Sequence, residues 1–203
     1  MTDDHVLSRT ALIVFAIKAQ LLRLRRAFAD LTGDRVRRLM KASQPSGRAL
    51  AEVITPLYSD DNPHERALQL GKVQNLRIGA RALDGRMMAP GALFSFWAHV
   101  GRPHRGRGFV EGRELRQGCL IPTIAGGLCQ LSNSLYCAAQ LTGCEIVERH
   151  GHTAAIPDSP FPAGEDATVF WNYVDLRFRS RTPLCLRVRL SERDLIVRLE
   201  ALS

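Results

Sequence analysis

The alternation of residue types near the C-terminus constrains the fold more than any other feature of the sequence. Within residues 184–190, leucine and valine alternate with Cys185, Arg187 and Arg189, and a polar turn at 191–194 leads into a second apolar run. Side chains in a strand point to opposite faces in turn, so residues 184–200 are predicted to form an antiparallel hairpin with one buried and one wet face.

Two further strands are predicted upstream of this hairpin. Residues 92–97 follow a Pro-Gly turn and place Phe94 and Phe96 on one face, and residues 167–178 are rich in β-branched and aromatic side chains. The strand-rich part of the chain therefore lies mostly towards the C-terminus.

The predicted helices lie mainly before these strands. A first helix is predicted over residues 6–42, where apolar residues recur at spacings of three and four, namely Val14, Ile17, Leu21, Leu24, Phe28 and Leu31. A second is predicted from Asn62, which can cap it, with Pro63 at its first position. A third follows Gly126 and Gly127 and ends near Gly143. We therefore expect an α+β fold, in which N-terminal helices precede a mainly antiparallel sheet and the Gly-Gly-Leu-Cys helix packs on that sheet.

Positive charge is concentrated at the N-terminus of this 203-residue chain, which has a formal net charge of +8. Residues 1–50 hold ten basic and four acidic side chains, against eighteen and sixteen in residues 51–203. We predict a basic amphipathic helical extension over 1–50 and one domain over 51–203. The apolar seam of residues 6–42 favours docking on the domain or on a partner helix, while its arginines suit peripheral contact with an anionic membrane. No nucleic-acid partner is expected, because the domain itself is close to neutral.

Cysteine usage and the N-terminal residues bear on the compartment. The five cysteines are irregularly spaced and form no CxxC pair, which argues against a disulfide framework and favours a reducing compartment. No apolar run has the length of a membrane span, and the acidic start MTDDH is a poor match for a secretory signal. A cytoplasmic or membrane-peripheral location is the expectation from the sequence, although the compartment is left open.

Cys129 is the first candidate for chemistry. Gly126 and Gly127 allow a sharp turn before it, and the predicted helix begins beside it. The positive end of a helix dipole favours thiolate over thiol, and backbone N–H groups there could stabilise an oxyanion. The alternative is an inert cysteine at a site of close packing.

The sequence ERHGHT supplies two histidines that point to the same side if the segment is extended, His150 and His152. Either could act as general base for Cys129. A zinc site completed by Cys129 or Asp166 is a weaker alternative, and we expect neither a metal nor another cofactor. Arg149 could hold a carboxylate through both of its terminal nitrogens, or could simply be solvated.

The sequence GEDATVFW contributes an acid and an aromatic residue. Asp166 could accept a hydrogen bond from a histidine ring and fix its tautomer, or could form an Asx turn. Trp171 is a core residue by default, but a tryptophan at the edge of a cleft often stacks on a ligand.

These blocks occur in an order that resembles the VanW family, named after a protein encoded in some vancomycin-resistance clusters. The resemblance covers roughly residues 73–200 and rests on GGLCQLSNSLY, ERHGHT, GEDATVFW and DLRF. The family pattern usually has glycine where this chain has Ala125, and serine where it has Thr153. Some proteins of the family have been linked to L,D-transpeptidase activity, which cross-links peptidoglycan stem peptides through a cysteine acyl-enzyme.

The resemblance implies a cell-envelope protein that performs acyl transfer on a peptidoglycan stem peptide or precursor. Cys129 would be the nucleophile, His152 or else His150 the base, and Asp166 the residue that orients the imidazole. The residues expected to contact substrate are Gln130, Ser132, Arg149, Gly127 and Trp171. The alternative is a non-catalytic module that binds a wall precursor or a protein partner through the same residues.

Overall fold

The computed structural model describes residues 17–18, 20–28, 36, 38–41, 47–58, 65–116, 119–152 and 164–202. The chain divides into two compact units, residues 1–35 and 36–203, whereas the sequence predicts a boundary at residue 50. In the first unit, residues 17–18 and 20–28 are helical, and the side chains of Ile17, Leu24 and Phe28 are exposed. The remaining residues of the predicted helix up to 16 lie outside the described part of the chain.

The predicted helix over 6–42 does not include residues 38–41. These residues are extended, and Lys41 forms an antiparallel bridge with Arg86. The backbone N–H of Met87 donates to Met40 O at 2.9 Å. Tertiary pairing therefore overrides the helical periodicity at this end of the segment.

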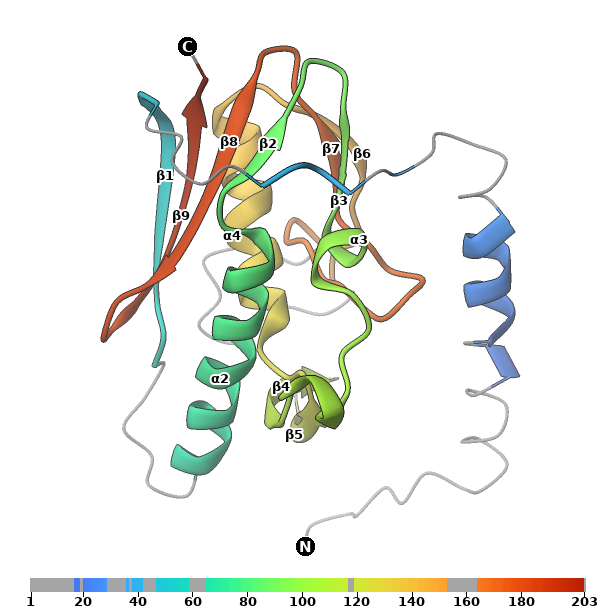
Figure 1. Ribbon diagram of the computed structural model, residues 1–203. Helices are drawn as coiled ribbons and strands as arrows, with labels where there is room; N and C mark the ends of the chain where they lie inside the picture. Colours follow the sequence, from blue (N-terminus) through green and yellow to red (C-terminus); the bar gives the residue numbers. More distant parts are fainter. Residues whose placement is uncertain are drawn as a thin grey trace, which may run out of the picture. The chain divides into compact units, whose positions relative to one another are not determined.

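The described residues of the second unit form three antiparallel sheets (Figure 1). The largest has the strand order β1-β9-β8-β2, formed by β1 (Ala49–Pro56), β2 (Arg86–Met88), β8 (Leu184–Leu190) and β9 (Asp194–Ala201). The second has the order β3-β7-β6, formed by β3 (Leu93–Ser95), β6 (Glu145–Glu148) and β7 (Arg177–Arg179). A hairpin pairs β4 (Glu111–Arg116) with β5 (Cys119–Ile124).

Helices occur between these strands as well as before them. They are α2 (Arg66–Leu83), α3 (Phe96–Val100) and α4 (Leu128–Leu141), with a 3₁₀ turn at Arg105–Arg107. The α+β class predicted from the sequence is confirmed. The helix predicted from Asn62 is α2, which begins at Arg66, while Asn62 and Pro63 lie outside the described residues.

The predicted C-terminal hairpin is present as β8 and β9, with Leu186 opposite Leu199 and Val188 opposite Val197. These four side chains are buried, as the alternation requires. Cys185 departs from the pattern, because it is fully buried although it alternates with them.

The other two strand predictions are wrong in part. Strand β3 ends at Ser95, whose hydroxyl accepts a hydrogen bond from Ala98 N and caps α3, so Phe96 is helical. Of residues 167–178, only Arg177 and Phe178 lie in a strand, β7, while Phe170 and Val174 form an isolated bridge across a turn. The β4–β5 hairpin was not predicted, because β4 (EGRELR) is largely polar and Pro122 interrupts the short apolar run of β5 (CLIPTI).

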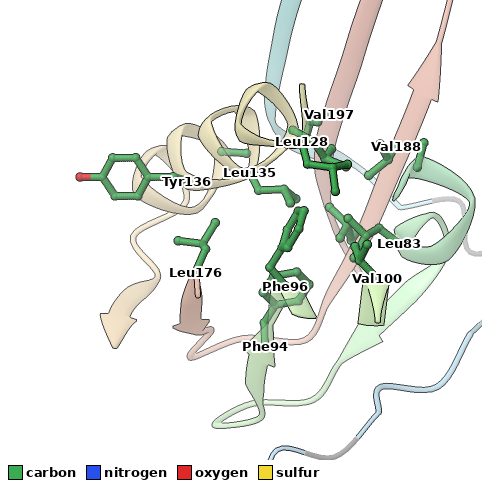
Figure 2. Packing of buried hydrophobic residues seen from close by; sticks show 14 of the residues in the cluster. Leu83, Phe94, Phe96, Val100, Leu128, Leu135, Tyr136, Leu176, Val188 and Val197 are labelled. Atoms are coloured by element: carbon green, nitrogen blue, oxygen red, sulfur yellow. The ribbon is translucent and has the colours of Figure 1, made fainter. Parts of the chain in front are cut away.

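The hydrophobic core lies between α2, α4 and the sheets. Figure 2 shows Leu128 and Leu135 of α4 directed into the same cluster as Phe94 and Phe96. Leu128, Leu135, Phe94 and Phe96 are at most 3% exposed. Helix α4 also contacts β1, β9 and β6. Burial at Leu128 fixes the N-terminal end of the helix that carries Cys129.

Candidate active site

The turn before α4 brings Cys129 to the second position of the helix. Gly127 is the N-cap residue, with φ of 97° and ψ of −12°, and Ala125 also has a positive φ of 69°. Gly127 O accepts from Gln130 N at 3.0 Å, and Ala125 O faces Leu128 N at 3.4 Å. Two of the first three helical N–H groups are thus engaged with the turn itself. The positive end of the helix dipole nevertheless lies beside the Cys129 thiol.

Two buried polar residues of α2 hold this turn. The Asn75 side chain donates to Val110 O and Gly126 O at 3.0 Å each and accepts from Val110 N at 3.0 Å. The stem of Lys72 lies against Gly127, where a Cβ atom would come within 2.1 Å of Lys72 Cγ. Position 127 therefore requires glycine for two reasons, its positive φ and the absence of space.

The Cys129 sulfur is half-buried against residues 168 and 169. Cys129 Sγ lies 3.3 Å from Thr168 Oγ1 and 3.9 Å from Val169 O. The same helix also holds the preceding residue, because Ala167 N donates to Asn133 Oδ1 at 2.6 Å and Ser132 Oγ donates to Ala167 O at 2.5 Å. Side chains of α4 thus fix the backbone that lies beside the thiol.

His152 and Asp166 form a close pair next to this segment. His152 N donates to Asp166 Oδ1 at 2.8 Å, and His152 Nδ1 makes a short contact with Asp166 Oδ2. The Asp166 side chain is nearly fully buried, whereas a quarter of the His152 side chain is exposed. With Nδ1 facing the carboxylate, Nε2 is the ring nitrogen that can exchange a proton with another group.

His150 has a different carboxylate. Its Nε2 lies 3.3 Å from Glu148 Oε1, and half of its side chain is exposed. Glu148 also faces Arg177 Nε at 3.4 Å and accepts from Asp175 N at 3.2 Å. The two histidines of ERHGHT therefore belong to separate carboxylate networks.

Residues 166–168 form a short segment that contacts both Cys129 and His152. Asp166 holds His152, Thr168 contacts Cys129, and Thr168 N donates to His150 O at 2.8 Å. Two residues span at most about 6.6–7 Å along the chain, so the two candidate side chains contact neighbouring points of this segment. Within the described residues, no hydrogen bond joins Cys129 Sγ to the ring of His150 or His152.

The residues expected to contact substrate make internal contacts in the structure. Gln130 Nε2 donates to Thr55 Oγ1 at 3.0 Å and Pro56 O at 2.8 Å, which ties α4 to β1. Ser132 is fully buried; its hydroxyl donates to Ala167 O and also lies 3.0 Å from Cys129 O. Both side chains hold the site together, and their contact with a substrate stays a prediction.

Arg149 and Trp171 also pack against their neighbours. Arg149 Nη1 donates to Gly164 O at 2.6 Å and Asp166 O at 2.7 Å, and its guanidinium lies 5.4 Å from the centre of the Tyr136 ring. Arg149 thereby fixes the backbone on which Asp166 sits. Trp171 is half-buried and meets Trp97 edge to face, with ring centres 5.3 Å apart.

Cys137 and Cys185 have surroundings that favour the thiol. Burial raises the pKa of Cys137, which is on the same helix as Cys129, and burial is also the main cause that raises the pKa of Cys185. In the part of the chain that the structure describes, no three His, Cys, Asp or Glu side chains are grouped closely enough to hold a metal ion.

The sequence reasoning missed Thr168, Glu148, Lys72 and Asn75. Thr168 could have been found from its position two residues after Asp166, which puts both on the same side of an extended segment. Lys72 and Asn75 are three residues apart on the buried side of α2 among apolar residues, which is an unusual place for polar side chains. Glu148 carries no comparable signal in the sequence.

The candidate residues lie in a region of the chain that is similar to known proteins. The model of the VanW like protein family matches residues 71–200. The chain belongs to the VanW family. This VanW-family match includes Lys72, Asn75 and Cys129, as well as the histidines and Asp166. No solved structure matches the chain at a significant level.

Two curated proteins are similar to this VanW-family chain. The Vancomycin B-type resistance protein VanW of Enterococcus faecalis is 32% identical over 136 residues, covering 66% of this chain and 50% of that protein. The uncharacterized protein YoaR of Bacillus subtilis is 33% identical over 127 residues, covering 62% of this chain and 41% of that protein. The match thus spans half or less of these relatives.

Proposed function

We propose that this protein is a cysteine-dependent acyltransferase that acts on a peptide, with a peptidoglycan stem peptide or precursor as substrate. The proposal rests on one observation, which is that the thiol and the imidazole both contact residues 166–168. Thr168 contacts Cys129 Sγ, and Asp166, two residues earlier, holds His152. A nucleophile, a base and a residue that orients the base are the parts that nucleophilic acyl transfer requires.

The proposed reaction has two stages. The S–H proton of Cys129 passes to Nε2 of His152, the sulfur attacks the peptide carbonyl, and the Sγ–C bond forms. The C–N bond then breaks, and the leaving amine takes the proton from His152, which yields a thioester. An acceptor amine attacks the thioester and releases the thiol. Asp166 favours the imidazolium that forms between these steps.

The substrate class is supported by family membership and by the name of one relative. The Enterococcus relative is a vancomycin resistance protein, and the sequence blocks resemble a family linked to cross-linking of stem peptides. The contacts within the described residues suit any peptide acyl donor. The stem peptide is therefore the first donor to test.

Intact-mass measurement tests the proposal. Wild-type protein incubated with a stem-peptide donor should gain the mass of the acyl group, and Cys129→Ala should not. Cys137→Ala is the matched control, because Cys137 is a second half-buried cysteine on α4, and it should acylate like wild type. Wild-type protein that gains no mass across a panel of donors would contradict the proposal.

One observation favours a binding module as the second candidate. The Cys129 thiol faces the backbone carbonyl of Val169, an acceptor that suits a protonated thiol. A binding module would retain saturable binding of the stem peptide in Cys129→Ser and give no turnover. Isothermal titration with that variant distinguishes the two functions.

A further inference from the structure

The Thr168 hydroxyl lies 3.3 Å from Cys129 Sγ. Within the described residues, this is the hydrogen bond that Thr168 Oγ1 makes, so its hydrogen is not committed to a backbone carbonyl. A hydroxyl that can turn its hydrogen towards sulfur stabilises the charged form of the thiol over the neutral form. The neutral thiol has its own acceptor, Val169 O at 3.9 Å.

In a second threonine–cysteine contact, the hydroxyl hydrogen is already bonded to a backbone carbonyl. Thr142 Oγ1 lies 3.4 Å from Cys144 Sγ, but it also donates to Ala138 O at 2.9 Å and faces Ala139 O at 3.1 Å. This bonding back to the preceding helical turn is common for threonine and uses its one hydrogen. The two hydroxyls lie at similar distances from sulfur. They differ because the Thr142 hydrogen is bonded to a backbone carbonyl of its helix, whereas the Thr168 hydrogen is not bonded to a carbonyl of the described residues.

The backbone around Thr168 is held from both sides. Thr168 N donates to His150 O at 2.8 Å, and Ala167 is bonded through N to Asn133 and through O to Ser132. Asn133 and Ser132 belong to α4, the helix that carries Cys129. The helix thus fixes the position of the donor relative to its own thiol, which limits the reorganisation needed when charge develops on sulfur.

We propose that the Thr168 hydroxyl is a catalytic donor that stabilises the Cys129 thiolate. This inference deepens the proposed acyl transfer and rests on it. When the S–H bond breaks, its proton goes to Nε2 of His152 and the electron pair stays on sulfur. The Thr168 O–H bond stays intact and donates to the negative sulfur, as charge-assisted hydrogen bonds do.

The test is the rate of alkylation of Cys129 by iodoacetamide as a function of pH, followed by peptide mass mapping. Thr168→Val keeps the shape and removes the hydroxyl, so its half-maximal rate should move about one pH unit higher and its rate at pH 7 should fall about tenfold. Thr168→Ser should restore the wild-type profile to within about threefold, since its hydroxyl can make the same kind of bond. Thr142→Val should leave the Cys129 profile unchanged, and thermal unfolding of each variant checks the fold.

An unchanged profile in Thr168→Val would overturn the inference, and so would a rate that falls equally at every pH, which is the mark of altered packing. Wild-type Cys129 that resists iodoacetamide throughout would also overturn it. The acyl-enzyme measurement stays separate from these outcomes. A shifted profile in a protein that accepts no acyl group supports the donor role of Thr168 and contradicts the proposed reaction.

Discussion

Asp166 uses its two carboxylate oxygens for different tasks. Oδ1 accepts from the backbone of His152 and so positions the residue, while Oδ2 faces the ring and so selects the tautomer. Because one carboxylate does both, the orientation of the imidazole does not depend on contacts made by the exposed side of the ring. Within the described residues, Glu148 faces the other ring nitrogen of its histidine, Nε2 of His150, and makes no such backbone contact with it.

Asp166→Asn separates the roles of the two histidines. The Asn side-chain oxygen can still accept from His152 N, but its amide N–H₂ would face Nδ1 and favour the wrong tautomer. If His152 is the base, acyl-enzyme formation should slow by about 100-fold or more in this variant, in the range that general base catalysis contributes.

Glu148→Gln is the corresponding variant for His150, because it removes the negative charge beside the ring, while Oε1, which faces His150 Nε2 and accepts from Asp175 N, can stay an oxygen. It should keep the acylation rate within a few-fold of wild type. Stopped samples followed by intact mass give both rates. A large loss in Glu148→Gln with a small loss in Asp166→Asn would assign the base to His150.

Ala125, in the turn before Cys129, has a backbone conformation that lowers the stability of the fold. Its backbone has a positive φ of 69°, a conformation that glycine adopts without steric cost. An L-residue in the left-handed region costs about 1–2 kcal/mol. Burial of the Ala125 methyl group and the lower entropy of alanine in the unfolded chain offset part of that cost.

At the scale of elements, the N-terminal end of α4 is defined by its contact with α2. Asn75 and Lys72 hold the turn from one side, and Leu128 fills the core on the other. These anchored residues hold Cys129 half-buried at the second position of the helix. The tightest point of the contact is Gly127.

Gly127→Ala should destabilise the protein more than Gly143→Ala. Both positions have positive φ, but a Cβ at 127 would meet Lys72 Cγ at 2.1 Å, and a Cβ at 143 has no atom within 4 Å. Strain alone should lower the free energy of unfolding by about 1 kcal/mol at 143. Overpacking should add about 1–3 kcal/mol at 127. Urea unfolding measures both, and equal losses would contradict the close contact seen here.

At the scale of the whole second unit, His99 fastens the extended residues 38–41 to the domain. Its Nε2 accepts from Leu39 N at 3.0 Å, and its Nδ1 donates to Ser95 O at 2.7 Å. The ring is fully buried and stacks on Phe94 with centres 5.1 Å apart. Burial, with the Arg86 and Arg38 cations, lowers the pKa of His99 to about 4.

The stability of the protein should therefore fall as the pH falls from about 6.5 to about 4. Over this interval the unfolded chain binds a proton at His99 and the folded protein does not, so protonation favours unfolding. The expected loss from this group is on the order of 3 kcal/mol, present in full above pH 6.5. Urea unfolding at several pH values measures it. His99→Gln has no titrating ring at this position, so its free energy of unfolding should fall over this interval by about 3 kcal/mol less than that of the wild type. An equal loss in both proteins would contradict the assignment to His99.

Part of this site could be read from the sequence because its signals are local. The Gly-Gly turn before Cys129 and the two-residue spacing of the histidines depend only on neighbours along the chain. The hairpin of β8 and β9 is equally local, since strand alternation and a turn specify it. The α+β class follows from the same kind of pattern.

The remaining features depend on long-range packing. Cys129 meets Thr168 across 39 residues, and His152 meets Asp166 across 14, and no periodicity encodes which acid or hydroxyl arrives at which group. Residues 38–41 and Phe96 departed from prediction because the Met40–Met87 pairing and the Ser95 cap overrode local propensity. The sequence by itself therefore determined the α+β class, the β8–β9 hairpin and the candidate side chains of the site. Only the tertiary structure decided their partners, because a hydrogen bond between distant residues exists only where packing brings both groups into range.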